Sequence, residues 1–198
     1  VGCVITGNLV NHSGGGLSCY GSSATLTNCT ISGNRSLQSC GAVACGSSSL
    51  TLTNCTIVGN WAQNCGGICT VSCDATLTNC TIAANASESW GGGLLFRGGV
   101  AALTNCTISG NSAQFGGGGI VCEDCTPSLT NCVLWANTPE SVCGNLSHCL
   151  TDLDPFFVDG GVFDFARFVT VEIGGVEWSL PDFVVEPPDY HLRPGCPA

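Results

Sequence analysis

Short alternations of apolar and polar residues recur through the first 149 positions, and asparagine or glycine interrupts each of them. Residues 25–31 read Thr-Leu-Thr-Asn-Cys-Thr-Ile, with Leu26 before the asparagine and Ile31 after it. Alternation with a period of two predicts β-strands. Asn, Gly and Ser between such runs predict tight turns. The stretch therefore predicts two short strands that meet at a bend on Asn28.

Close copies of this stretch return every 25 or 26 residues. The central cysteine recurs at Cys3, Cys29, Cys55, Cys80, Cys106 and Cys132. The asparagine before it recurs at Asn28, Asn54, Asn79, Asn105 and Asn131, and the one that closes the copy at Asn8, Asn34, Asn60, Asn85, Asn111 and Asn137. A glycine-rich opening of a further strand precedes Leu17, Val43, Ile68, Leu94 and Ile120. About three short strands per repeat, with few strong helix formers, predict an all-β parallel β-helix of about six turns.

Equivalent residues of successive turns are expected to stack in columns. Leu26 and Cys29 point inward, and Asn28 takes the left-handed conformation and hydrogen-bonds to the equivalent amide one turn away. Threonines point outward at Thr25, Thr27, Thr51, Thr53, Thr76 and Thr78. Parallel strands lie ~4.8 Å apart, wider than the β-carbon separation in a disulfide. The cysteine column is therefore predicted to stay mostly reduced and to pack as small apolar side chains.

Disulfides are expected among the other cysteines of the 17 in the chain. The candidate pairs are Cys69 with Cys73, Cys122 with Cys125 and Cys143 with Cys149 within turns, and Cys40 with Cys65 between adjacent turns. Because 17 is odd, at least one thiol is free or bonds outside the chain. This density of cysteine indicates an oxidising location, extracellular or at the cell surface.

The repeat period is lost near Leu150, which divides the chain into a β-helix over 1–149 and a C-terminal segment over 150–198. Residues 167–180 read as two alternating strands joined by Gly174 and Gly175, a two-residue hairpin. A solenoid needs a polar cap over its exposed core. We expect the segment to be that cap, and the alternative is an aromatic docking surface that includes Trp178.

The phrases LTNCTISGNSAQFGGGGI and LTNCTIVGNWAQNCGGI resemble repeats of right-handed parallel β-helix proteins of the pectin-lyase-like superfamily. The likeness is greatest to bacterial surface proteins and to the repeats of polymorphic outer-membrane proteins. The phrases DPFFVDGG and DYHLRPGCPA resemble those that end bacterial β-helices, where Ser commonly stands at the position of Cys196. The resemblance implies a right-handed β-helix. It implies no single activity, because this scaffold carries many.

Charge limits the chemistry that the chain can support. Charged residues make up 9% and the net charge is −10, so nucleic acid and anionic membranes are not expected as partners. No apolar run approaches the ~18 residues of a membrane span. Enzymes of the superfamily that cleave acidic polysaccharides use clustered acids, often with calcium, and an Arg or Lys as base. The repeat region holds only scattered candidates: Asp74, Glu88, Glu123, Asp124 and Glu140, with Arg35 and Arg97.

We therefore expect no catalytic residues, cofactor or metal. Calcium at Asp152, Asp154 and Asp159 is an alternative to capping and turn roles for these residues. Because Val1 enters in mid-turn, either a longer protein precedes it or another copy covers this end. The expected function is a non-catalytic extracellular structural protein, either a rigid surface module or a filament subunit. Its partners would be copies of itself, bound through the N-terminal end and the C-terminal segment. The alternatives are a carbohydrate-binding or polysaccharide-cleaving β-helix and ice binding by the threonine grid.

Overall fold

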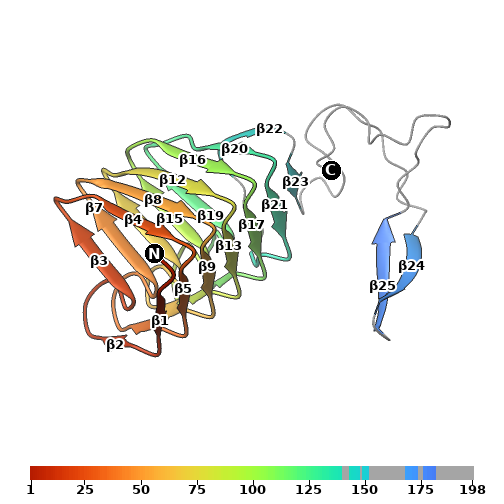
Figure 1. The fold of residues 1–198 in the computed structure, drawn as a ribbon, viewed down its shortest axis with the longest axis horizontal. Coiled ribbons are helices and arrows are strands. Elements are labelled where there is room, and N and C mark those ends of the chain that lie inside the picture. Colours follow the sequence, from red (N-terminus) through yellow and green to blue (C-terminus); the bar gives the residue numbers. More distant parts are fainter. Residues whose placement is uncertain (140–142, 148, 152–167, 174–175, 182–198) are drawn as a thin grey trace.

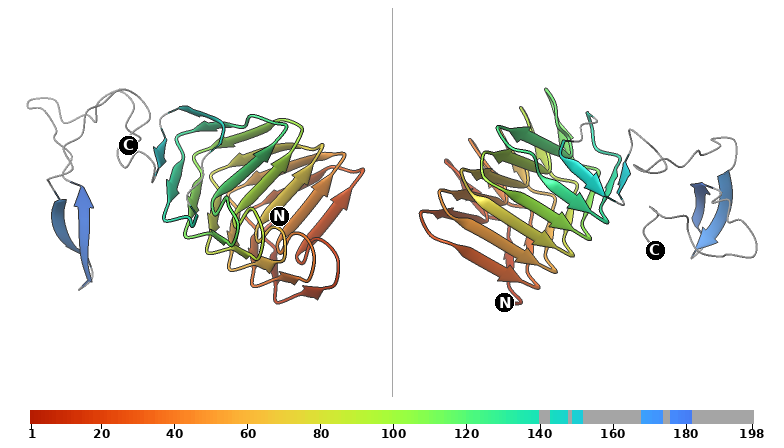
Figure 2. Two further views of the ribbon diagram at one scale, coloured as in Figure 1. Left: turned by 180° about the vertical axis from the view of Figure 1, so that it is seen from behind. Right: turned by 90° about the horizontal axis from the view of Figure 1, so that it is seen from above.

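A computed structural model describes residues 1–139, 143–147, 149–151, 168–173 and 176–181. Parallel strands follow one another around stacked turns, and the chain advances along the stack from β1 to β23 (Figures 1 and 2). No described residue is helical. The expected all-β parallel β-helix is thus confirmed, and the turns amount to about five.

Each turn contributes to four sheets, which we number in the order in which one turn visits them. The first sheet contains β3 (Leu17–Tyr20), β7 (Val43–Gly46), β11 (Ile68–Val71), β15 (Leu94–Arg97) and β19 (Ile120–Glu123). The second contains β4 (Ala24–Thr27), β8 (Ser49–Thr53), β12 (Asp74–Thr78), β16 (Ala101–Thr104), β20 (Ser128–Thr130) and β22 (Asn145–Ser147). The third contains β1 (Val4–Thr6), β5 (Thr30–Ser32), β9 (Thr56–Val58), β13 (Thr81–Ala83), β17 (Thr107–Ser109), β21 (Val133–Trp135) and β23 (Leu150–Thr151). The fourth contains β2 (Leu9–Val10), β6 (Arg35–Ser36), β10 (Trp61–Ala62), β14 (Ala86–Ser87) and β18 (Ser112–Ala113).

The structure has four strands per turn where the sequence predicts three, and the additional strand of each turn forms the fourth sheet. Its strands are two residues long, too short to show a period-two alternation. They pair in register all the same, as Arg35 pairs with Trp61 and Trp61 with Ala86.

Equivalent apolar residues stack to form one continuous core. In the second sheet Leu26 pairs with Leu52, and Leu52 with Leu77. In the third sheet Ile31 pairs with Ile57, which pairs with Ile82. From Leu52 onward these side chains are fully buried. Parallel strands that bury the same residue type at the same height need no change of packing from turn to turn, so the core extends simply by adding turns.

A buried column of asparagines runs beside this core. Each side chain donates from Nδ2 to Oδ1 of the asparagine one turn later, over 2.8–3.0 Å, and the same Oδ1 accepts the backbone N–H of the donating residue. The members are Asn8, Asn34, Asn60, Asn85, Asn111 and Asn137. Nδ2 also donates to a main-chain carbonyl of the preceding turn, as Asn85 does to Ile57 at 3.0 Å. The five members from Asn34 on are at most 5% exposed, so their polar groups are buried and paired.

The glycine-rich openings are explained by a close approach of backbone. A β-carbon on Gly92 would lie 2.4 Å from the carbonyl oxygen of Ser112, and one on Gly66 would lie 2.5 Å from the amide nitrogen of Ala86. Ser112 and Ala86 belong to fourth-sheet strands of the next turn. Glycine is therefore required where the chain passes from the fourth sheet to the first.

The C-terminal strands β24 (Phe168–Ile173) and β25 (Val176–Pro181) pair antiparallel, with Ile173 opposite Val176. Their register leaves two residues for the loop, as the sequence predicts. The capping role of 150–198 stays a prediction. The alternative calcium ligands Asp152, Asp154 and Asp159 lie outside the described residues, as does Glu140. Within the described ranges, there is no helix of the length and hydropathy that crossing a membrane requires.

We predict that Asn85→Ala lowers the free energy of unfolding by about 3 kcal/mol or more, because it leaves buried donors and acceptors on two neighbouring turns unpaired. Asn79→Gly is the matched control. It removes an exposed asparagine while keeping the left-handed backbone accessible, and it is expected to cost under about 1 kcal/mol. Urea denaturation measures both, and equal losses for the two variants would contradict the assignment of stability to the buried column.

Candidate functional site

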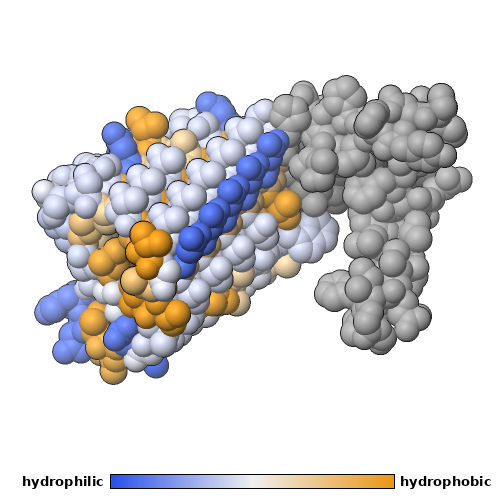
Figure 3. All heavy atoms as spheres, viewed as in Figure 1, coloured by the Kyte–Doolittle hydropathy of each residue, from blue (hydrophilic) through white to orange (hydrophobic). Residues whose placement is uncertain are grey.

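A straight polar ridge runs along the stack where the second sheet meets the third. Asparagine occupies the bend in five successive turns with φ of 53–56°, in the left-handed region. The exposed members are Asn28, Asn54, Asn79, Asn105 and Asn131. Each Nδ2 from Asn54 on donates to Oδ1 of the asparagine one turn earlier, over 3.1–3.2 Å. The continuous hydrophilic stripe in Figure 3 follows this column.

Threonine columns flank the ridge on both sides. On the second sheet Thr27, Thr53, Thr78, Thr104 and Thr130 stand in register. On the third sheet Thr30, Thr56, Thr81 and Thr107 do the same. All of these are partly or fully exposed. The outer column of the expected grid holds Thr25, Thr51 and Thr76, but Ala102 and Ser128 continue it. The paired-threonine surface therefore extends over three turns only.

The acidic residues described in the repeat region do not gather at a common site. Glu123 forms an ion pair with Arg97, one turn earlier on the first sheet, with Oε2 2.8 Å from Nε. Asp74 accepts the backbone N–H of Val100 at 2.9 Å. Asp124 occupies a left-handed turn position with φ of 54°. Among the described residues, no three His, Cys, Asp or Glu side chains gather as metal ligands would.

Aromatic side chains make two contacts between adjacent turns, at or near the fourth sheet. The guanidinium of Arg35 lies 4.0 Å from the centre of the Trp61 ring, a cation–π contact between adjacent turns. Trp90 and Phe115 lie one turn apart with ring centres separated by 6.2 Å, and they are 47% and 62% exposed. Sequence reasoning missed both pairs, because the partners are 25 or 26 residues apart and belong to no repeated motif.

The cysteine column lies against the core, beside the asparagine bends. Cys29, Cys55, Cys80, Cys106 and Cys132 are at most 3% exposed, whereas Cys3 in the first turn is exposed. Their thiols donate to main-chain carbonyls, as Cys55 Sγ does to Thr53 O at 3.3 Å. All six are free thiols. Burial raises the pKa of Cys55, so it is protonated at neutral pH.

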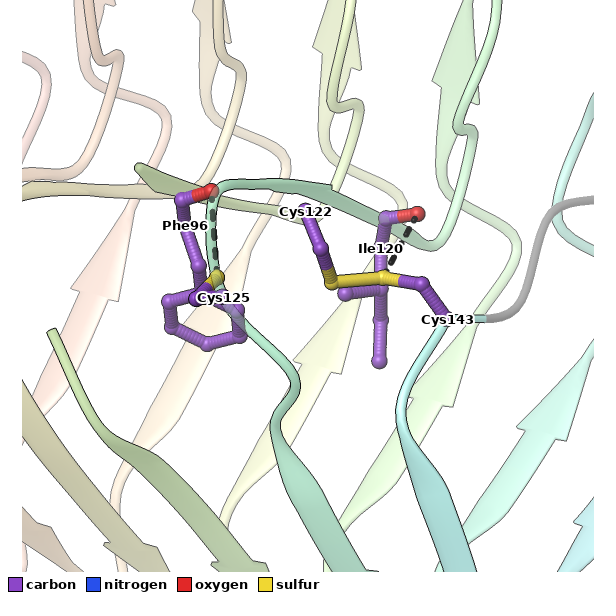
Figure 4. Close-up of a disulfide and its surroundings, with 5 residues drawn as sticks. All are labelled: Phe96, Ile120, Cys122, Cys125 and Cys143. Carbon is purple, nitrogen blue, oxygen red and sulfur yellow. Dashed lines mark hydrogen bonds between the residues drawn. A yellow bond between two sulfur atoms is a disulfide. The ribbon is translucent and has the colours of Figure 1, made fainter. Parts of the chain in front are cut away.

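The disulfide of the structure corrects two of the expected pairs. Cys122 bonds to Cys143, with the two α-carbons 6.2 Å apart (Figure 4). It does not bond to Cys125, whose thiol instead lies 3.6 Å from the carbonyl oxygen of Phe96. Cys149, the expected partner of Cys143, is a buried free thiol. The bond connects a first-sheet strand, β19, to the corner that precedes β22 one turn later.

The remaining candidate pairs are also unbonded in the structure. Cys69 and Cys73 are both free, because their side chains pack in different clusters. Cys73 packs in the main core, and Cys69 packs in a second, smaller hydrophobic cluster. This second cluster contains Cys40, Ala44, Cys65, Cys69 and Leu95, and it covers the outer face of the first sheet. Cys40 and Cys65 lie in adjacent turns, as expected, and both are free thiols. Burial raises the pKa of Cys65.

Comparison with protein families gives one match, to the model described as the right-handed β-helix region, over residues 1–143. Comparison with curated proteins and with solved structures finds no match. The matched residues include strands β1 to β21. The comparisons therefore bear on the fold and assign no activity.

We predict that the reduced protein loses stability as the pH rises above about 9. Burial, followed by the contact with Cys45, raises the pKa of Cys73 from 9.0 to about 12, and burial also raises the pKa values of Cys55 and Cys65. These thiols keep their protons in the folded state at a pH where unfolded thiols lose them. Their contribution is complete below pH 9 and is lost as the pH rises toward 12. The urea midpoint, measured in reductant from pH 9 to about 10.5, should fall.

Cys73→Ala should reduce the slope of that fall, and Cys3→Ala should leave it unchanged because Cys3 is exposed. A midpoint that stays level through pH 10 would contradict this account of the buried thiols.

Proposed function

Because the chain belongs to the right-handed β-helix family, we propose that it is a non-catalytic structural module of an extracellular or cell-surface protein. The observation that carries the proposal is the pair of uninterrupted asparagine columns, one buried and one exposed, along the stacked turns. Side chains that hydrogen-bond along the axis resist bending and stretching of the stack, in addition to the backbone ladders of four sheets. A scaffold of this kind suits a rigid spacer.

The dimensions of the stack agree with a modular role. Each turn adds ~4.8 Å along the axis, so five turns extend over roughly 24 Å. Length is set by the number of turns and requires no change in the core, because each turn presents the same residue types to its neighbours. A protein can lengthen such a spacer by repeating the 25- or 26-residue unit.

Composition supports a location outside the cell. Cysteine makes up 17 of the 198 residues, and a disulfide is formed between successive turns. The exposed ridge consists of Asn and Thr rather than charged side chains, so its hydration does not depend on ionic strength. The ion pair of Glu123 with Arg97 and the hydrogen bond from Val100 to Asp74 support the non-catalytic part of the proposal.

A more specific form of the proposal is that copies of the protein associate end to end. In the first turn, Val4 on β1 and Leu9 on β2 are 70% and 64% exposed. Open parallel edges with apolar side chains accept further strands in register. Such a contact is head-to-tail and generates filaments when it does not close.

We predict that concentrated protein forms filaments one β-helix wide in electron micrographs, and that Val4→Lys with Leu9→Lys abolishes them. Charges at an open strand edge oppose pairing with another chain. Val100→Lys is the matched control, since Val100 is 68% exposed at a corner on the side of the stack. Separate modules at every concentration would reject end-to-end association. Cleavage of any acidic or neutral polysaccharide by the purified protein would reject the non-catalytic assignment.

A second candidate function, carbohydrate binding, is favoured by the exposed Trp90–Phe115 pair. Aromatic rings on adjacent turns offer apolar faces to sugar rings, next to polar side chains that can hydrogen-bond hydroxyl groups. Trp90 packs over Gly116, where an added β-carbon would lie 2.8 Å from its ring. The orientation of the ring is therefore fixed before any ligand binds.

If this pair binds polysaccharide, Trp90→Ala should weaken retention on an insoluble polysaccharide at least about tenfold in a pull-down titration, which corresponds to about 1.4 kcal/mol. Trp135→Ala is the control, because Trp135 is equally exposed, at 46%, but lies on the third sheet. Equal retention of both variants and the unsubstituted protein would reject the aromatic pair as a binding site.

A further inference from the structure

Two cysteines outside the repeated column lie close together in adjacent turns. Cys45 is the third residue of β7, and Cys73 immediately precedes β12. Their sulfur atoms are 3.0 Å apart, closer than a normal contact between non-bonded heavy atoms. Each residue is 1% exposed and both pack in the main core. In the structure both are free thiols.

The position of this pair repeats that of the Cys122–Cys143 disulfide. Cys122 is the third residue of β19, as Cys45 is of β7, and both strands belong to the first sheet. Cys143 stands in the corner before β22, as Cys73 stands in the corner before β12. The strand β22 pairs with β20, which follows β19, and β12 pairs with β8, which follows β7. Both pairs therefore connect a first-sheet strand to the second-sheet corner of the next turn.

We propose that Cys45 and Cys73 form a second disulfide between successive turns of the β-helix, linking the same sheet to the same corner as Cys122–Cys143. The pair is absent from the candidates that sequence reasoning supplies, which place Cys73 with Cys69. It is separated by 28 residues along the chain, so no local spacing reveals it.

Neighbouring thiols are less suitable partners. Cys69 contributes to the cluster on the outer face of the first sheet, away from the core that holds Cys73. Cys19 pairs in register with Cys45 on the strand before it, and directly stacked strand residues are spaced more widely than a disulfide allows. Cys45 and Cys73 are offset by one corner as well as one turn, which brings their sulfur atoms together.

The bond forms by thiol–disulfide exchange with a small-molecule disulfide such as oxidised glutathione. One cysteine thiolate attacks the oxidant, gives a mixed disulfide and releases one glutathione thiol. The second cysteine then attacks the protein sulfur of the mixed disulfide and releases the second glutathione thiol. Two cysteine thiols are oxidised, one glutathione disulfide is reduced, and the two protons pass to the departing thiolates. Because both thiols are buried in the folded state, the exchange takes place while the chain folds.

Refolding of the reduced, unfolded chain in a mixture of reduced and oxidised glutathione tests the proposal. Remaining thiols are alkylated, and the protein is cut with chymotrypsin, which cleaves after aromatic residues and separates Cys45 from Cys73 at Trp61. Tandem mass spectrometry should find the two peptides joined through Cys45 and Cys73, and separate after reduction. Alkylated Cys45 and Cys73 in protein that contains the Cys122–Cys143 bond would overturn the proposal, and so would a Cys69–Cys73 bond.

Variants supply a second readout. The oxidised protein should unfold at a temperature at least about 3 °C higher than protein in which the Cys45 thiol is replaced, because the bond restricts the unfolded chain. Cys45→Ser and Cys73→Ser should each remove this rise in unfolding temperature, and the double variant should show no further decrease. Cys69→Ser is the matched control and should keep both the rise and the linked peptide. Losses from Cys45→Ser and Cys73→Ser that add in the double variant would count against a shared bond.

Discussion

Hydrogen bonds between residues one turn apart hold the β-helix together, and they require each turn to superimpose on the next. The repeated cysteines of successive turns are 26 residues apart, except for one interval of 25 between Cys55 and Cys80. The way the structure accommodates this exception shows how strictly the requirement applies. Connections from the fourth sheet to the first contain six residues at 37–42 but five at 63–67, and six again at 88–93. The missing residue is thus absorbed in a corner, and all four sheets stay in register on both sides of it.

The two asparagine columns have different structural roles, one in the backbone bends and the other in hydrogen bonds to the main chain. The exposed column occupies left-handed bends, where asparagine is among the few non-glycine residues that fit easily. The buried column pairs main-chain groups of two turns: Oδ1 of Asn60 accepts the backbone N–H of Asn34, and Nδ2 of Asn34 donates to the carbonyl of Ile5 on β1. Their amides run in opposite directions, because exposed members donate to the preceding turn and buried members donate to the following one. The stack therefore gains side-chain hydrogen bonds along its axis in both directions.

The sequence is sufficient to predict the fold, because a repeat exposes every column several times over. Leu26, Asn28 and Cys29 are each identified by comparison with their own copies. The features that it does not predict are the two-residue strands of the fourth sheet, which are too short to show an alternation, and two features without copies, the Trp90–Phe115 pair and the partner of Cys122. Each of these depends on contacts across turns, where 21 to 28 residues of chain separate atoms that touch. Spacing along the sequence is a poor measure of distance in a solenoid.

The same geometry separates the cysteines into two roles. A thiol on a strand has its equivalent one turn away directly above it, at the strand spacing, and this is too wide for a bond but suited to packing. A thiol at a corner is free of that spacing, since the corner follows no ladder and can bring its side chain across to the strand of the turn before. Cys143 is of this second kind and bonds to Cys122 on strand β19 of the turn before. Cys80 and Cys106 lie between the strands of the second and third sheets, in a column that keeps the turn-to-turn spacing of the strands beside it, and they stay free. A β-helix can therefore hold a column of reduced thiols in its core while cross-linking successive turns at its corners, in the same oxidising surroundings.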